Sequence, residues 1–287
     1  MIPFTERFIA LARERSPLCL GIDPSADLLD HWGLPDDIEG VRRFCGTVLD
    51  AAVDLVPMMK PQMAFFERHG SAGYAEAAAA VAQIRARDAL CLIDAKRGDI
   101  ASSMEGYAAA IFESTDGLGA DAVTLNPYLG FETLDPVISR AQVTGGGVFV
   151  VVRSTNPSAR LLQTARLSDG RSVAEALADE ITAHNASIGG DIGPVGSVIG
   201  STLADEDTTI VERLPRSLIL TPGLGAQGAE MSDVMRIFGT ARGRVIPAIS
   251  RGILGHGPNR TELRDAIKRY RDAAWSIWDT APAGASA

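Results

Sequence analysis

The most regular feature of the chain is a series of short apolar runs, each ending in a polar or glycine-containing turn. They lie at residues 18–23, 56–60, 89–94, 122–126, 147–152, 195–200, 217–221 and 244–249. Each run is almost continuously hydrophobic, which is typical of strands buried on both faces of a parallel sheet. The pattern therefore predicts eight buried, parallel strands.

Helical patterns fill the intervals between these runs. Apolar residues at helical spacing, with many alanines, predict helices at residues 38–53, 72–86, 102–114 and 173–186. Strands alternating with helices predict an α/β fold, a single (β/α)8 TIM barrel with its active site at the C-terminal face of the strands. An open doubly wound sheet is the alternative, although no G-x-G-x-x-G sequence follows the first run.

The barrel is expected to account for nearly the whole chain. Barrels of about 250 residues are single domains, so we expect one catalytic domain over residues 1–280. Residues 281–287 carry no pattern and are expected to be disordered. The segment 153–171 is longer than an ordinary connection and rich in polar residues, so we expect it to be functional or mobile.

Composition narrows the class of function. Hydrophobic residues make up 46% of the chain, which is ample for a large core, and the net charge is −9. That charge argues against a nucleic-acid partner but allows a small anionic ligand in a local positive pocket. No 18-residue apolar stretch and no signal-peptide pattern is present, so no membrane association is expected. Cys19, Cys45 and Cys91 form no C-x-x-C pair, which fits a reducing, cytoplasmic compartment.

Charged residues gather where the predicted strands end, which is the catalytic face of a barrel. The third run ends in Asp94-Ala-Lys96-Arg-Gly-Asp99, the second in Lys60 and the first in Asp23. Asp94 and Lys96 are two residues apart, so their side chains point the same way, and Lys60 on the neighbouring strand can approach both. We interpret the group as a catalytic carboxylate–lysine–carboxylate array. The alternative is a solvated cluster of ion pairs.

Such an array is suited to decarboxylation followed by proton transfer. A lysine between carboxylates is held protonated, because opposite charges favour the charged form. A protonated, positioned lysine can deliver a proton to a carbanion, while a fixed carboxylate repels a substrate carboxylate and favours its departure as CO2. These interactions accelerate the reaction only where they are stronger in the transition state than in the ground state.

Two later loops have the features of a phosphate site. Residues 222–228 are rich in glycine and follow the seventh run, and Arg251 lies just beyond the eighth. Loops in these positions of a barrel often bind phosphate through backbone N–H groups, and Gly225 and its neighbours permit a close approach. Arg251 can add a bidentate contact. Ser154, after the fifth run, is either a turn residue or a group that reads a polar edge of the ligand.

Together these motifs closely resemble the orotidine 5′-phosphate decarboxylase family, in its longer bacterial type. The resemblance rests on residues 93–100 (IDAKRGDI), 124–130 (TLNPYLG) and 222–228 (PGLGAQG), and it runs from residue 21 to residue 251. It implies a homodimeric barrel with shared active sites. It also implies decarboxylation of orotidine 5′-phosphate to UMP, the last step of de novo pyrimidine synthesis, with neither cofactor nor metal.

The resemblance also implies a role for each member of the array. Lys96 would protonate C6 of the pyrimidine, and Asp94 would face the departing CO2. Lys60 and Asp99 would complete a charged tetrad, with Asp99 reaching into the site of the other subunit. Asp23 would contact the ribose hydroxyls.

The remaining implied contacts bind the substrate. Ser154 would read the pyrimidine edge, and Gln227 and Arg251 would hold the phosphate. Gly225 in the glycine-rich loop and Asn126 at the end of the fourth run are expected from their positions to contact the substrate as well.

The chain departs from the usual family pattern at a few positions. Ala101 stands where Gly or Pro is usual, and Ser103 stands where Thr is usual but keeps a hydroxyl for the ribose. Ala229 stands where a second glycine is common in the phosphate loop.

Three other functions are compatible with parts of the pattern. A metal-dependent sugar-phosphate decarboxylase or aldolase of the same wider barrel group would need a further acidic ligand at a strand end, and Lys60 stands where one is expected. A Schiff-base enzyme would need Lys96 as a free amine, which flanking carboxylates disfavour. A non-catalytic nucleotide binder would leave the converging charges unexplained.

Overall fold

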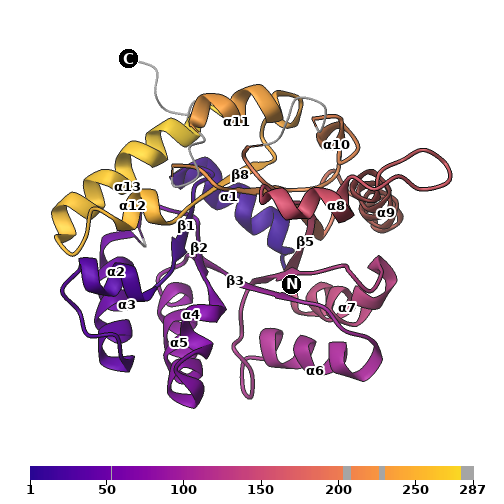
Figure 1. Ribbon diagram of the computed structural model, residues 1–287. Coiled ribbons are helices and arrows are strands. Elements are labelled where there is room, and N and C mark those ends of the chain that lie inside the picture. Colours follow the sequence, from indigo (N-terminus) through magenta and orange to yellow (C-terminus); the bar gives the residue numbers. More distant parts are fainter. Residues whose placement is uncertain (53, 203–207, 226–229, 279–287) are drawn as a thin grey trace.

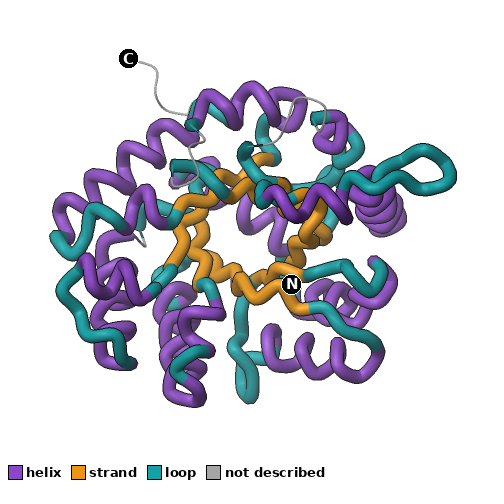
Figure 2. Tube along the Cα trace, viewed as in Figure 1, coloured by secondary structure: helices purple, strands orange, loops and turns teal. Residues whose placement is uncertain are grey.

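The chain folds as a closed barrel of eight parallel strands, which confirms the fold predicted from the hydrophobic pattern. The computed structural model describes residues 1–52, 54–202, 208–225 and 230–278. The strands pair in sequence order, and the last returns to pair with the first. They are β1 (Cys19–Ile22), β2 (Met58–Pro61), β3 (Leu90–Arg97), β4 (Ala122–Leu125), β5 (Gly147–Arg153), β6 (Val195–Ile199), β7 (Ile219–Pro222) and β8 (Val245–Ile249). Figure 2 shows them as a ring at the centre of the molecule.

Helices surround this ring (Figure 1). The four predicted helices correspond to α3 (Ile38–Ala52), α5 (Gly70–Arg85), α6 (Ala101–Phe112) and α9 (Val173–Ile188). The other helices outside the barrel are α2 (Ala26–His31), α4 (Met63–Glu67), α7 (Asp135–Thr144), α8 (Arg160–Gln163), α10 (Thr209–Glu212), α11 (Met231–Phe238), α12 (Arg251–Leu254) and α13 (Arg260–Trp275). Most of these are one to three turns long, too short for a clear helical period, and α13 is strongly charged along its length.

The N-terminal helix α1 (Phe4–Arg15) covers the end of the barrel where the strands begin. Phe4 and Phe8 are buried, and the Phe4 ring meets Phe149 of β5 edge-on at 5.8 Å. Arg7 Nη1 donates to Asp121 Oδ1 at 2.6 Å, directly before β4. The helix α1 therefore separates this end of the barrel from solvent and leaves the carboxyl ends of the strands on the opposite side.

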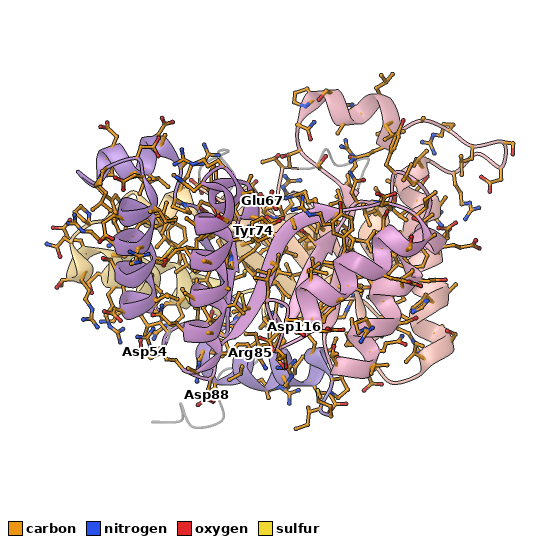
Figure 3. All side chains as sticks on the ribbon, turned by 90° about the horizontal axis from the view of Figure 1, so that it is seen from below. Asp54, Glu67, Tyr74, Arg85, Asp88 and Asp116 are labelled. Atoms are coloured by element: carbon orange, nitrogen blue, oxygen red, sulfur yellow. The ribbon has the colours of Figure 1, made fainter. Side chains whose placement is uncertain are left out.

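The two ends of the barrel are distinguished in Figure 3. Arg85 and Asp88 lie toward the end covered by α1, whereas Glu67 and Tyr74 lie toward the carboxyl end of the strands. Among the described residues, no helix is long and apolar enough to span a membrane.

The segment 153–171 carries local structure of its own. It contains a short 3-10 helix (Pro157–Ala159) and α8, and Arg166 bridges to Ser172 as a single antiparallel pair. Ser172 then caps α9: it accepts a hydrogen bond from Glu175 N, and its own N–H donates to the Glu175 carboxylate. This capping box fixes where the segment ends. The tail predicted at residues 281–287 lies outside the described residues.

Candidate active site

The predicted charged array is present where β2 and β3 end. Asp94 is buried and accepts hydrogen bonds from two lysines, with Lys60 Nζ 2.7 Å from Oδ2 and Lys96 Nζ 2.6 Å from Oδ1. Lys60 is buried as well, whereas the Lys96 side chain is 46% exposed. The array therefore presents one ammonium group to the mouth of the barrel and keeps the other beneath it.

The charge state of the array follows from these contacts. Burial opposes ionisation of Asp94, but the charges of Lys60 and Lys96 and the hydrogen bonds that they donate outweigh it and hold the Asp94 pKa far below its usual range. Burial likewise disfavours a charged Lys60, yet the carboxylates of Asp94 and Asp23 raise the pKa of its ammonium group above the usual value. Asp94 and Lys60 are therefore both ionised at neutral pH.

Two further polar residues, for which the sequence predicted no role in the site, complete the array. Thr124 of β4 donates its hydroxyl proton to Asp94 Oδ1 at 2.8 Å, and Gln62 Nε2 donates to Oδ2 at 3.1 Å. Both left a signal in the sequence: Thr124 interrupts an apolar run, and Gln62 follows Lys60 by two residues, which is the spacing of one strand face.

Asp23 lies directly after β1 and is oriented by a residue from the far end of the chain. Ser250 Oγ, just after β8, donates to Asp23 Oδ2 at 2.5 Å. The other oxygen, Oδ1, is buried and has no hydrogen-bond partner among the described residues. A Cβ placed on Gly21 would lie 2.7 Å from Ser250 Cβ, so glycine is what lets β1 and this turn approach. A buried acceptor without a donor is suited to a ligand hydroxyl.

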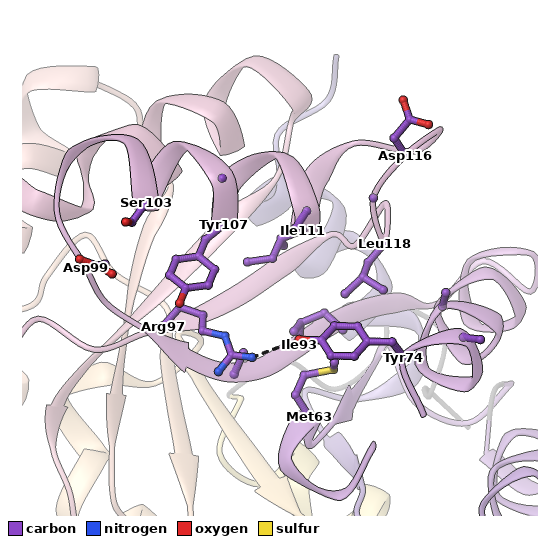
Figure 4. Close-up of a pocket in the computed structure, with 16 residues that line it drawn as sticks. Met63, Tyr74, Ile93, Arg97, Asp99, Ser103, Tyr107, Ile111, Asp116 and Leu118 are labelled. Atoms are coloured by element: carbon purple, nitrogen blue, oxygen red, sulfur yellow. Dashed lines mark hydrogen bonds between the residues drawn. The ribbon is translucent and has the colours of Figure 1, made fainter. Parts of the chain in front are cut away.

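Asp99 and Ser103 lie apart from the lysines within this chain. The Asp99 carboxylate accepts a 2.8 Å bond from Ile100 N, and across the described residues it makes no ion pair with Lys60 or Lys96. Asp99 and Ser103 instead line an open groove of about 720 Å³ between α5 and α6, outside β3. Figure 4 shows the two residues close together at one end of α6.

Polar and aromatic side chains cross the same groove. Arg97 forms an ion pair with Glu67, and its guanidinium lies 5.6 Å from the Tyr107 ring centroid. The Tyr74 hydroxyl accepts from Arg97 at 3.5 Å, drawn as the dashed line in Figure 4. The floor of the groove is the outward face of β3, where Ile93 lies.

The turns after β7 and β8 meet beside Arg251. Gly225 has φ of +75°, in the left-handed region that favours glycine. A Cβ on Gly225 would lie 3.2 Å from the Tyr270 hydroxyl oxygen, and one on Gly252 would lie 2.9 Å from the same atom. Arg251 begins α12, is exposed, and forms no ion pair with the residues that the structure describes. Gln227, the other predicted phosphate contact, lies outside the described residues.

Ser154 and Asn126 are placed at the ends of β5 and β4. Ser154 Oγ donates to Asn156 Oδ1 at 2.8 Å and accepts from Gln163 Nε2 at 3.1 Å, which ties it to α8. Asn126 Oδ1 accepts from Tyr128 N at 3.1 Å and so closes a local turn. Both residues lie at the carboxyl end of the barrel.

These features define an enzyme of the (β/α)8-barrel class, with an ionised Asp94 held between Lys60 and Lys96 at its catalytic face. Within the described ranges, no group of three or more His, Cys, Asp or Glu residues could hold a metal ion.

Comparison with known proteins assigns the family. The chain belongs to the orotidine 5′-phosphate decarboxylase / HUMPS family, whose model matches residues 16–266. It is 47% identical over 280 residues to the orotidine 5′-phosphate decarboxylase of Myxococcus xanthus, covering 97% of each chain. It is 44% identical over 270 residues to that of Streptomyces coelicolor, covering 94% of this chain and 96% of the relative.

A solved structure extends the comparison to the fold. A crystal structure from Streptomyces avermitilis, described as an orotidine 5′-phosphate decarboxylase, superimposes with a TM-score of 0.91 at 41% identity. The match covers 98% of this chain and 97% of that one. The family expected from the motifs and the barrel expected from the hydrophobic runs are both confirmed.

Proposed function

We propose that this chain decarboxylates orotidine 5′-phosphate to UMP and CO2, the last step of de novo pyrimidine synthesis. Relatives that carry the name of this activity share 41 to 47% identity with it over nearly their whole length. The single observation that carries the proposal is the ionised Asp94 held between Lys60 and Lys96 at the barrel mouth.

Lys96 is assigned as the proton donor. The bond between C6 and the carboxylate breaks, the electron pair stays on C6, and CO2 leaves. A proton from the Lys96 ammonium then forms the C6–H bond. Asp94 faces the departing carboxylate, where its fixed negative charge favours loss of CO2, and Lys60 keeps Asp94 ionised. The Lys96 side chain is partly exposed, whereas Asp94 and Lys60 are buried. This difference supports Lys96 as the proton donor and the other two residues as fixed charges.

The other strand ends are assigned to substrate binding. Asp23 binds the ribose through its free Oδ1, and Arg251 with Gly225 binds the phosphate. Ser154 reads the pyrimidine edge. Further substrate contacts are proposed, from the sequence motifs, for Gln227, Ser103 and Asn126.

A homodimer with shared active sites is also proposed. Among the residues that the structure describes, Asp99 makes no ion pair with Lys60 or Lys96, and it lines an open, largely apolar groove, so Asp99 and the groove are both available to a second copy. Asp99 then completes the tetrad of the neighbouring subunit. The three free, buried cysteines support a reducing, cytoplasmic location.

The test is the loss of orotidine 5′-phosphate absorbance on addition of purified protein, with and without EDTA. With the protein at a concentration far below that of the substrate, equal, multiple-turnover consumption in both samples is the expected result. Turnover that disappears with EDTA and returns with a divalent cation would favour the metal-dependent sugar-phosphate chemistry of the same barrel group. No consumption of orotidine 5′-phosphate in either sample would refute the proposed activity.

A further inference from the structure

The hydroxyl of Thr124 contacts both halves of the Asp94–Lys96 pair. It donates to Asp94 Oδ1 at 2.8 Å, and its oxygen accepts from Ala95 N at 3.1 Å and from Lys96 N at 3.0 Å. A threonine hydroxyl has one proton to donate and two lone pairs. All three are used, and the side chain is 1% exposed.

The backbone of β3 is irregular where these bonds form. Its register against β4 shifts between Ile93 and Arg97, and Lys96 has φ of +47°, in the left-handed region that non-glycine residues avoid. A bulged strand loses ladder hydrogen bonds, so its N–H groups need other acceptors. Thr124 Oγ1 supplies that acceptor for two successive N–H groups.

We propose that Thr124 is a positioning residue, which sets the backbone of Lys96 and the carboxylate of Asp94 in one fixed relation. The inference rests on the proposed roles of these two residues and goes beyond them, because Thr124 itself touches no reacting atom. The Thr124 hydroxyl on β4 contacts the bulged backbone of β3 and the Asp94 carboxylate at once, so Lys96 and Asp94 cannot move independently. Misplacement of a catalytic group by about 1 Å can cost on the order of 100-fold in rate.

Two substitutions separate the hydroxyl from the shape of the side chain. Thr124→Val keeps the branched shape and removes the hydroxyl, whereas Thr124→Ser keeps the hydroxyl. We expect Thr124→Val to lower kcat by about 10- to 100-fold with KM changed by less than about 3-fold, since the array is misaligned while substrate contacts remain. Thr124→Ser should restore kcat to within about 3-fold of the wild type.

A matched control comes from the same barrel. Ser197 of β6 is also fully buried, but its hydroxyl has no hydrogen-bond partner among the described residues. Ser197→Ala should therefore leave kcat within about 2-fold of the wild type. Thermal unfolding of each variant reports whether it is folded. If Thr124→Val fails to fold, Thr124→Ala, which also removes the hydroxyl, takes its place.

The outcomes distinguish this inference from the function on which it rests. Lys96→Ala is assayed in parallel on orotidine 5′-phosphate. Wild-type turnover by Lys96→Ala would contradict the proposed catalytic role. If Lys96→Ala is defective while a folded Thr124→Val, or Thr124→Ala in its place, keeps wild-type kcat, the positioning role of Thr124 alone is overturned. Equal losses of kcat for Val and Ser would also overturn it, since the hydroxyl would then be irrelevant.

Discussion

Side chains at the barrel mouth fall into two groups, those with partners inside the chain and those without. Lys60 donates a hydrogen bond to Asp94, and both side chains are ionised. Asp23 keeps one buried oxygen without a donor, and Arg251 makes no ion pair within the described part of the chain. We propose that the first group carries out the chemistry and that the second binds the nucleotide.

Arg251 gives a prediction about the phosphate. Arg251→Ala should weaken binding of UMP by about 10- to 100-fold, because a hydrogen bond to a charged group contributes about 1.5–3 kcal/mol. Binding of uridine, which lacks the phosphate, should change by less than about 2-fold. Isothermal titration with both ligands measures the difference. Arg43→Ala, an exposed arginine on α3, is the control and should affect neither. Equal weakening of nucleotide and nucleoside would refute the phosphate role.

Secondary-structure elements were predicted well where burial leaves a simple signal and poorly where it does not. The eight strands were recognisable because each is buried on both faces. The bulge at Lys96 was not, because the hydrophobic pattern carries no information on strand register. The bond between Asp23 and Ser250 joins residues 227 positions apart and depends on barrel closure. The lysines and aspartates were therefore identifiable, whereas the contacts of Thr124 with Asp94 and of Ser250 with Asp23 required the structure.

The helix α1 provides a prediction at this scale. Phe8 is fully buried, and its ring meets the Trp278 ring edge-on at 6.0 Å. Phe8→Ala should lower the free energy of unfolding by about 3–5 kcal/mol, the range for removing a buried aromatic ring. Urea unfolding followed by circular dichroism measures it. Val143→Ala on α7, where the side chain is 76% exposed, should change stability by less than about 0.5 kcal/mol. A similar small change for Phe8→Ala would show that α1 does not stabilise the barrel.

At the scale of the whole molecule, α1 covers one end of the barrel, and Asp99 lies apart from Lys60 and Lys96 of the same chain. Asp99 follows Lys96 by only three residues, yet it lines the groove outside β3 and not the barrel mouth. A second copy of the chain, applied with two-fold symmetry, would offer its own Asp99 in exchange. We propose that residues 1–280 form one catalytic domain and that two copies of the chain act together as a homodimer.

Shared sites can be tested with hybrid dimers. Lys96→Ala and Asp99→Ala should each be inactive alone. After mixing and subunit exchange, half of the dimers are hybrids with one intact site each, so activity should recover to about a quarter of the wild-type value. Native mass spectrometry, with one parent isotopically labelled, confirms that exchange has occurred. Hybrid dimers that stay as inactive as the parents would show that Lys96 and Asp99 act within one chain or not together.

The most direct test of the account is single-turnover decarboxylation of orotidine 5′-phosphate by Lys96→Ala. Removal of a positioned proton donor should slow the chemical step by about 100- to 10,000-fold. The far-ultraviolet circular dichroism spectrum and UMP binding should be retained, because Lys96 lies at the mouth of the barrel and not in its core. A rate close to that of the wild type in a folded, ligand-binding variant would contradict the claim that this array performs the reaction.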